Sequence, residues 1–328
     1  MKKVSLIIYE DVVLSAISGV LDLMNGANRH LQECGRTPAF TVELVSEKDA
    51  EVSLRAPALF SGCKTLDEIN HTDLIIVPAF FNAPSETILR KNAGIVEWIK
   101  DMHLRGAEVA SLCLGSYFLA EAGLLNGKMA TSHWAAVDDM RRRYPKVNML
   151  SDKVITDQQG VYTSGGAFSS LNLVLYLIEK FCGRETALWT SKFFSIDMDR
   201  VSQAHFAVFQ SQRRHEDEGV LKAQAFIEEH YHKDITVEQI AQHVNMSRRN
   251  FIRRFKSATQ NTPLEYLQRV RIEAAKKALE KNSENIGSLM YDAGYNDVKT
   301  FRSVFKRITG LTPKDYRRKY SRAGMETV

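Results

Sequence analysis

Short apolar runs and amphipathic stretches alternate along the first half of the chain. The runs at 3–9, 40–46 and 72–80 are rich in Val, Ile and Leu, which is typical of buried parallel strands. The stretches at 14–31 and 92–106 instead repeat their apolar residues at helical spacing. Such repeated strand and helix units predict an α/β domain, a parallel sheet covered by helices on both faces.

The same alternation continues to about residue 183. Residues 107–112 have the pattern of a strand that runs into Cys113 and then a helix. Residues 161–183 have the pattern of a strand, a Ser-Gly-Gly turn and a long buried helix. Cys113 stands just before Gly115-Ser116, so the sequence predicts a sharp strand-to-helix turn with a thiol at its corner, the layout of a nucleophile elbow.

The pattern changes after residue 208. Residues 209–219, FQSQRRHEDEG, are polar or charged apart from Phe209 and have no periodicity, which predicts a linker. No strand-like alternation reappears after it. We therefore expect a first domain over 1–208, this linker, and an all-helical domain over 220–328.

The helical part contains one pattern twice, at 235–268 and 284–318. Each copy begins with a short amphipathic helix and turns at Asn245 or Gly294, residue types that tolerate a positive φ. A second helix then carries two Phe four positions apart, and each copy closes on Thr-Pro ahead of a further helix. A helix, a tight turn and a second helix with a free basic face are typical of a helix-turn-helix motif.

We expect the two motifs at about 237–258 and 285–308, held at a fixed separation by a helix over 263–282. Two linked recognition helices can enter successive major grooves on one face of DNA, about 34 Å apart. Arg and Lys pair with guanine, Asn with adenine, and Thr or Ser with phosphate or either base. A helical dimerisation domain is the alternative interpretation. The expected DNA-contacting residues are Arg248, Arg249, Asn250, Arg253 and Lys256 in the first copy and Lys299, Thr300, Arg302, Ser303 and Lys306 in the second.

Charge is unevenly distributed between the two parts. Residues 220–328 hold 21 Lys and Arg against 12 Asp and Glu, a net charge of +9, whereas residues 1–219 have a net charge of −4. A basic second half is suited to a polyanion such as DNA. A solvated Lys- and Arg-rich surface has the same composition, so the charge alone leaves both interpretations open.

Composition narrows the class of protein further. A chain of 328 residues, 44% hydrophobic and 25% charged, is long enough for two globular domains. The four cysteines form no C-x-x-C and have no paired His spacing, which argues against a zinc site or a disulfide framework and indicates reduced thiols. We expect no cofactor. The apolar runs are too short for a signal peptide or a membrane span. We expect a soluble, cytoplasmic protein that does not bind membranes.

Residues 220–320 resemble the AraC/XylS family of transcription regulators, most specifically in AGYNDVKTFRSVFKRITGLTPKDYR. Residues 3–183 resemble the DJ-1/PfpI superfamily, which has a flavodoxin-like fold with a cysteine on a nucleophile elbow. That resemblance is carried by ASLCLGSYFLAEAGLL, ATSHW and VYTSGG. The segment IDMDRVSQAHF at 196–206 and the order of domains resemble the GlxA-like regulators. The resemblance implies a DNA-binding transcription regulator.

The resemblance also implies partners and a ligand pocket. The expected partners are double-stranded operator DNA, RNA polymerase, a second copy of the chain, and a small effector such as an amino acid or a quaternary ammonium compound. Open α/β sheets bind ligands at the carboxyl ends of their strands. Paired aromatic side chains there would suit a cation. The expected pocket residues are Ala16, Phe80, Phe81, Cys113, Leu114, His133 and Phe168.

Three interpretations of Cys113 remain open at this point. His133 follows it by 20 residues, as the corresponding His does in the superfamily, and could act as its base. Where enzymatic members place a Glu facing the thiol, this chain has Ala16, which cannot share a proton. We expect a ligand pocket without catalysis, ahead of an inert buried cysteine and of a cysteine hydrolase or amidase that uses Cys113 and His133. His133 has an equal alternative as a structural histidine beside Trp134.

Overall fold

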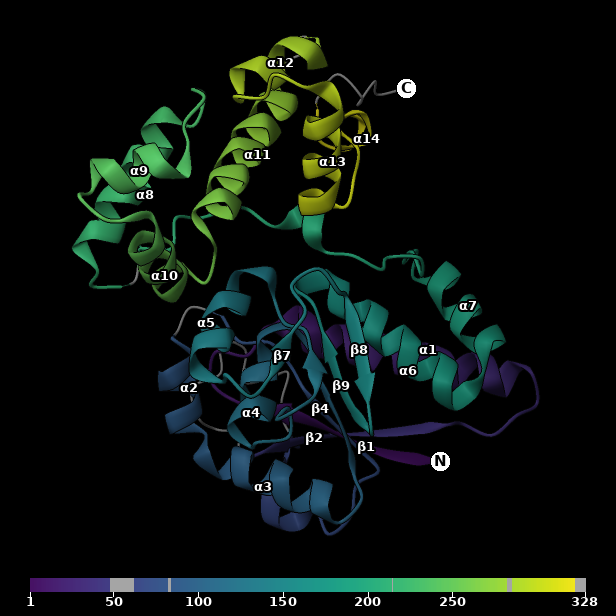
Figure 1. The fold of residues 1–328 in the computed structure, drawn as a ribbon. Helices are drawn as coiled ribbons and strands as arrows, with labels where there is room; N and C mark the ends of the chain where they lie inside the picture. Colours follow the sequence, from purple (N-terminus) through teal and green to yellow (C-terminus); the bar gives the residue numbers. More distant parts are fainter. Residues whose placement is uncertain (48–61, 82–83, 214, 282–284, 322–328) are drawn as a thin grey trace. The chain divides into compact units, whose positions relative to one another are not determined.

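The computed structural model of the chain consists of two compact units, Met1–Gln203 and Ala204–Val328 (Figure 1). Each unit has its own buried hydrophobic clusters. The structure describes residues 1–47, 62–81, 84–213, 215–281 and 285–321.

The first unit is built on a seven-stranded sheet. Its strands are β1 (Lys2–Ile8), β2 (Phe40–Ser46), β3 (Lys64–Thr65), β4 (Leu74–Val77), β5 (Glu108–Ser111), β8 (Ile155–Gln158) and β9 (Val161–Ser164), in the order β3-β2-β1-β4-β5-β9-β8. All neighbours pair in parallel except β8, which is antiparallel to β9. The predicted parallel α/β sheet is confirmed, with an antiparallel edge strand that the pattern did not reveal. A separate two-stranded ribbon joins β6 (Met129–Ala130) and β7 (Asn148–Met149).

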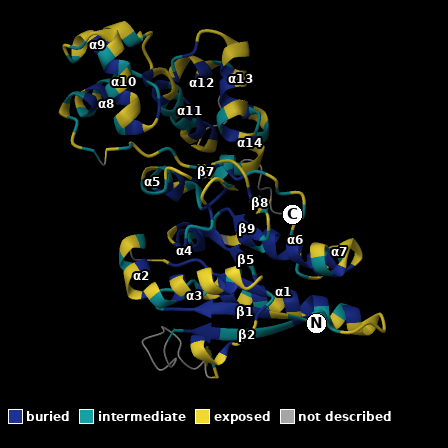
Figure 2. Cartoon of the chain, turned by 60° about the horizontal axis from the view of Figure 1, so that its bottom comes forward, coloured by how far each residue is buried: buried dark blue, intermediate teal, exposed yellow. Residues whose placement is uncertain are grey.

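Helices cover both faces of this sheet (Figure 1). One face carries α1 (Leu14–Glu33), α6 (Ser170–Cys182) and α7 (Arg184–Phe193), and the other carries α2 (Ser85–Lys91), α3 (Ala93–Leu104), α4 (Ser116–Glu121) and α5 (Val137–Arg143). Successive residues of β1 alternate between the two cores, with Leu6 and Ile8 in one and Ile7 in the other. Figure 2 shows the result, buried strands between helices whose outer faces are exposed.

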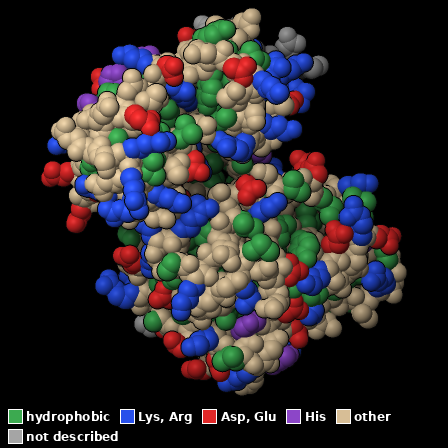
Figure 3. Space-filling view, in the orientation of Figure 1, with side chains coloured by type: hydrophobic (Ala, Val, Ile, Leu, Met, Phe, Trp, Pro, Cys, Tyr) green, Lys and Arg blue, Asp and Glu red, His purple; other side chains and the backbone are tan. Residues whose placement is uncertain are grey.

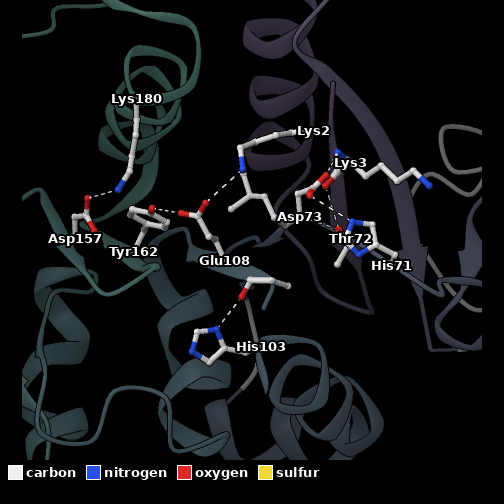
Figure 4. Close-up of polar contacts among 12 residues, drawn as sticks. Lys2, Lys3, His71, Thr72, Asp73, His103, Glu108, Asp157, Tyr162 and Lys180 are labelled. Carbon is white, nitrogen blue, oxygen red and sulfur yellow. Dashed lines mark hydrogen bonds and ion pairs between the residues drawn. The ribbon is translucent and has the colours of Figure 1, made fainter. Parts of the chain in front are cut away.

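Polar side chains link the strands at their amino ends (Figure 4). Glu108 at the start of β5 accepts a hydrogen bond from the Tyr162 hydroxyl and lies 3.5 Å from the Lys2 ammonium. Lys180 on α6 pairs with Asp157 at 2.8 Å. These contacts lie at the opposite ends of the strands from the predicted thiol corner. They therefore stabilise the sheet without contributing to that site.

The second unit contains helices and no strand among its described residues. Its helices are α8 (Glu218–His230), α9 (Val237–His243), α10 (Arg248–Thr259), α11 (Pro263–Lys281), α12 (Ile286–Asp292), α13 (Val298–Thr309) and α14 (Pro313–Tyr320). The turns before α10 and α13 contain Asn245 at φ +54° and Gly294 at φ +83°, the positive values expected of these residues. None of the helices described for this chain combines the length and apolar character needed to cross a bilayer.

The residues that precede α8 lie along this second unit. We call residues 204–213 and 215–217 the strap. The Ala207 carbonyl accepts from the buried Lys276 ammonium at 2.6 Å, and the ring of Phe209 packs edge-on against Tyr266 at a centroid distance of 5.2 Å. Most of the predicted linker is therefore packed irregular backbone of the helical unit, and α8 begins at Glu218.

Candidate functional site

The two helix-turn-helix motifs are oriented by buried aromatic residues. Phe251 and Phe255 on α10, and Phe301 and Phe305 on α13, are each at most 1% exposed. Because residues four apart lie on the same side of a helix, these pairs turn one face of each helix into a core and the opposite face outward. The Asp297 carboxylate caps α13 by accepting from the Thr300 backbone N–H at 2.6 Å.

The outward faces carry the predicted DNA-contacting side chains. All five on α13 are exposed, and on α10 all are exposed except Asn250, which is half-buried. Figure 3 shows Lys and Arg side chains gathered over the part of the unit where α10 lies. On α10, the Arg253 guanidinium donates to the Asn250 amide oxygen at 2.9 Å, and Arg248 pairs with Glu238 at 2.7 Å. The geometry thus leaves two basic helix faces available to a polyanion.

One residue that positions α10 escaped the sequence analysis. Arg254 donates from Nε and Nη2 to the two carboxylate oxygens of Asp217, at 2.8 and 2.6 Å. Hydrogen bonding by Arg254 lowers the pKa of this carboxyl group. Asp217 also caps α8 by accepting from the Val220 N–H at 3.1 Å. The end of the strap is therefore bonded to the first recognition helix.

The predicted sharp turn at Cys113 is present in the first unit. Cys113 has φ +56°, in the left-handed region that L residues rarely adopt, and α4 follows at Ser116. Gly115 lies so close to β4 that a Cβ there would be 2.3 Å from the Val77 carbonyl oxygen. The Cys113 carbonyl accepts from the hydroxyls of Ser116 and Ser132, at 3.1 and 3.2 Å. These bonds fix the elbow backbone.

The side chain that approaches the thiol from the first strand is a phenol. The Tyr9 hydroxyl is buried and donates to the Pro78 carbonyl at 2.5 Å. Burial, and to a lesser degree the nearby Cys113, raise the pKa of Tyr9 well above its ordinary value. Ala16, where enzymatic relatives were expected to have an acid, is a buried residue of α1 and packs in the core on that face of the sheet. The Tyr9 hydroxyl has one proton, and it already donates that proton to the Pro78 carbonyl. It therefore does not share a proton with the Cys113 thiolate as a carboxyl group would.

His133 lies in the segment that borders the elbow. Its Nδ1 accepts from the Ala135 N–H at 3.1 Å, and its ring lies against Gly166, where a Cβ would be 2.2 Å from the His133 Cδ2. The Trp134 ring lies 5.0 Å away between centroids. Burial lowers the pKa of His133, which favours the neutral imidazole. The structure thus brings Cys113 and His133 into neighbouring segments, joined through Ser132.

The remaining predicted pocket residues do not form one wall. Phe80 is 2% exposed and packs 6.0 Å from the Tyr117 ring in the opposite core from Ala16. Phe81 and Phe168 are 66% and 67% exposed, and Leu114 is half-buried. Phe80 and Phe81 separate because Phe80 bridges to Val12 in extended backbone, where successive side chains point to opposite sides. The two rings therefore do not face a cation together as the expected aromatic pair would.

Gln203 is a second residue that sequence analysis missed. It is 1% exposed, and its amide NH₂ donates to the Ser132 and Lys153 carbonyls at 2.8 and 3.1 Å. Its amide oxygen accepts from the Gly166 N–H at 3.2 Å. Gln203 therefore ties together the two segments that flank His133, and it is the last residue of the first unit. Only its place in the 196–206 segment could have drawn attention to it.

Across the described part of the chain, no group of three or more His, Cys, Asp or Glu side chains is arranged to hold a metal ion. All four cysteines are free thiols, with Cys34 exposed and Cys113 buried.

Comparison with known proteins finds matches to both halves of the chain. The DJ-1/PfpI family model matches residues 3–180, and a helix-turn-helix domain model matches residues 240–319. The HTH-type transcriptional regulator CdhR of Pseudomonas aeruginosa is 24% identical over 253 residues, which cover 77% of this chain and 74% of that protein. The HTH-type transcriptional regulator ArgR of the same species is 29% identical over 220 residues, 67% of each chain.

A third regulator and a solved structure are also similar to this chain. The HTH-type transcriptional regulator GlxA of Rhizobium meliloti is 22% identical over 217 residues, 65% of this chain and 66% of that one. The crystal structure of an AraC family transcriptional regulator from Pseudomonas putida superposes with a TM-score of 0.50 at 17% identity, covering 59% of this chain and all of that one. The chain thus belongs to the DJ-1/PfpI family, whose model matches more than half of its length, and it carries a helix-turn-helix domain in its second unit, an arrangement in which it is similar to regulators such as GlxA.

Proposed function

We propose that the chain binds operator DNA through the exposed faces of α10 and α13, and that a small metabolite held by the first unit controls this binding. The DNA-binding face is supported by the two buried Phe pairs, which leave the ten basic and polar residues named above directed outward. Arg253 and Lys299 are the residues we expect to contribute most on each helix, because both are cationic and exposed.

The observation that carries effector control is the position of Gln203. Its amide bonds the Ser132 carbonyl and the Gly166 N–H, in the two segments beside His133. The chain leaves Gln203 directly into the strap, whose last residue, Asp217, is bonded to Arg254 on α10. A ligand that moves either segment would act on a continuous backbone attached to a recognition helix. It would shift the population of DNA-competent molecules by its differential affinity for the two states.

The effector that we propose is an amino acid or a quaternary ammonium compound. The exposed rings of Phe81 and Phe168 supply aromatic faces that attract an organic cation. Because Nδ1 accepts from the Ala135 N–H, a neutral His133 carries its proton on Nε2, which can donate to the carboxylate of an amino acid.

We propose further that the first unit does not turn over a substrate. The phenol beside the thiol, and an imidazole whose Nδ1 already accepts from the Ala135 N–H, support a binding role. One observation favours the alternative, a cysteine hydrolase or amidase. Cys113 has a positive φ, the strained backbone conformation that is typical of the nucleophile in such an elbow.

Two further partners belong to the same proposal, RNA polymerase and a second copy of the chain. Leu188 and Phe193 on α7 are 41% and 55% exposed, and they offer apolar surface to a second copy. Sedimentation of the full chain at several concentrations tests the dimer. Run-off transcription with purified RNA polymerase tests the contact with the polymerase.

The test of the whole proposal begins with selection of DNA fragments by the full chain from a random pool. Binding of the selected fragment is then measured by fluorescence anisotropy with and without each of a panel of amino acids and quaternary ammonium compounds. We expect one compound to raise the melting temperature of the protein and to change DNA affinity by roughly 5- to 150-fold. Gln203→Ala should retain the thermal shift and lose most of the change in affinity. Failure to enrich any sequence contradicts the DNA-binding assignment, and enrichment without response to any compound contradicts effector control.

A further inference from the structure

The two helix-turn-helix motifs have separate cores. Residues of α8, α9 and α10 pack around Phe251 and Phe255, whereas residues of α12, α13 and α14 pack around Phe301 and Phe305. Among the helices that the structure describes, only α11 belongs to both, its first half to one core and its second half to the other. The shared helix α11 therefore links the motifs, and contacts outside the two cores can fix their relative angle further.

One such contact centres on Arg271, in the middle of α11. Its Nε donates to the Tyr231 carbonyl and its Nη2 to the Lys233 carbonyl, both at 2.8 Å. These carbonyls follow the end of α8, in the first motif's half. Carbonyls at a helix end lack intrahelical partners, so a cation there satisfies them. Arg271 is thereby fixed to the first half of the unit.

The same guanidinium also contacts the second half. It lies over the ring of Tyr295 at 5.4 Å, and Tyr295 is 5% exposed and belongs to the core around Phe301. Burial of the Arg271 guanidinium lowers the pKa of Arg271, as expected for a cation enclosed from both sides. A planar guanidinium can stack on a ring and donate in its own plane at once, which an ammonium cannot.

Gly294 shows how closely the two halves approach at this point. It is the turn residue of the second motif, and a Cβ on it would lie 2.5 Å from the Tyr231 carbonyl oxygen and 3.0 Å from the Arg271 Nε. The turn that sets up α13 therefore rests directly on the backbone at the end of α8. Glycine is required here twice, for its positive φ and for this approach.

We infer that Arg271, with Tyr231 and Gly294, sets the angle and separation of α10 and α13 and so selects the spacing between the two DNA half-sites. The inference rests on the proposed function, in which both helices contact DNA. Spacing is a property that neither recognition face determines alone. A one-base-pair change moves a half-site by about 3.4 Å along the duplex and rotates it, so a rigid pair of helices discriminates against it.

The test uses Arg271→Lys and Arg271→Ala in the full chain, with Lys277→Ala as a control that removes an exposed cation from the same helix. The probes are duplexes that carry the two half-sites selected by the wild type, at the selected spacing and at one or two base pairs more or fewer, and a duplex with one half-site. We expect wild type and Lys277→Ala to prefer the selected spacing by about tenfold or more. Both Arg271 variants should lose most of that preference and keep the single-half-site affinity within about twofold.

Gly294→Ala disturbs the same contact from the turn of the second motif, and it should also relax the spacing preference. It provides a second measurement if Arg271→Ala does not fold. Unchanged discrimination by spacing in the folded Arg271→Lys and Gly294→Ala proteins would overturn the inference. That result is distinct from failure of the proposed function, in which changing Arg253 or Lys299 would leave DNA affinity as in the wild type.

Discussion

Asp217 and Arg254 form a bidentate pair in which both carboxylate oxygens accept from the guanidinium, at 2.6 and 2.8 Å. The same carboxylate caps α8, so one residue joins the end of the strap, the start of α8 and the recognition helix α10. Such a fork is specific in orientation, because two parallel bonds fix the guanidinium plane. The placement of α10 therefore depends on a residue that makes no contact with DNA in our proposal.

Asp217→Asn should separate the two roles of this residue. Asparagine caps a helix about as well as aspartate, but it cannot accept a charge-assisted fork from Arg254. We expect α8 to remain folded by circular dichroism while affinity for the selected DNA falls about threefold, the scale of a partly exposed ion pair. Glu218→Gln removes the same charge one residue later and serves as the control. Equal DNA affinities for the two variants would show that the pair does not position α10.

Arg253→Ala and Lys299→Ala should each weaken binding to the selected DNA. A residue that reads a base should cost about tenfold or more and relax sequence preference at one position, whereas a phosphate contact should lower affinity for all sequences and reduce the salt slope by about 1. Anisotropy titrations at several salt concentrations distinguish the two cases. Lys222→Ala, an exposed cation on α8, is the control. Wild-type affinity for both variants at physiological salt would contradict the groove assignment.

Cys113 should react slowly with thiol reagents. It is 5% exposed, and the side chain that approaches it from the end of β1 is the buried phenol of Tyr9, whose hydroxyl donates to the Pro78 carbonyl. We expect iodoacetamide to label Cys113 at least about tenfold more slowly than the exposed Cys34 in the same molecule, as followed by peptide mass spectrometry. Cys113→Ser should bind DNA as the wild type does. Fast labelling, together with an amidase activity that this variant loses, would establish the enzymatic alternative instead.

Gly115→Ala should strongly destabilise the first unit. The added Cβ would lie 2.3 Å from the Val77 oxygen and 2.7 Å from the Pro78 oxygen, and both are backbone atoms that cannot move aside cheaply. We expect the free energy of unfolding to fall by about 3 kcal/mol in urea titrations. Gly287→Ala, whose Cβ would meet its nearest neighbour at 3.4 Å, should be close to neutral. A wild-type unfolding midpoint for Gly115→Ala would mean that the elbow is not packed against β4.

The repeated elements were predictable because their causes are local. Two Phe at i, i+4 and a turn residue with positive φ specify a helix-turn-helix motif without reference to the rest of the chain. Apolar runs bounded by turns likewise predicted β1, β2 and β4 of the parallel sheet. The antiparallel strand β8 was missed because its sequence, ITDQ, has polar residues at its exposed edge and little apolar pattern.

The residues that connect distant segments could not be predicted in the same way. Gln203, Asp217 and Arg271 act through backbone carbonyls or charges that lie far away in sequence, and no spacing rule relates such partners. Residues 209–219, most of which belong to the strap, were expected to be a linker because their polar composition predicts solvation. Its polar groups are instead hydrogen-bonded to the helical unit, as with Ser211, which donates to Glu228 at 2.8 Å.

His133 should make stability depend on pH in a defined direction. Burial lowers its pKa in the folded chain below the ordinary value, so the unfolded chain binds more protons as the pH falls below about 6.5. The stability associated with a neutral His133 is therefore complete above that pH and is lost as the pH falls through the folded pKa. His133→Asn keeps an oxygen able to accept from the Ala135 N–H and removes the titration. Urea unfolding at pH 7.5 and pH 5.5 should show a smaller loss of stability on acidification in the variant than in the wild type. Equal losses in the two proteins would mean that His133 titrates normally in the fold.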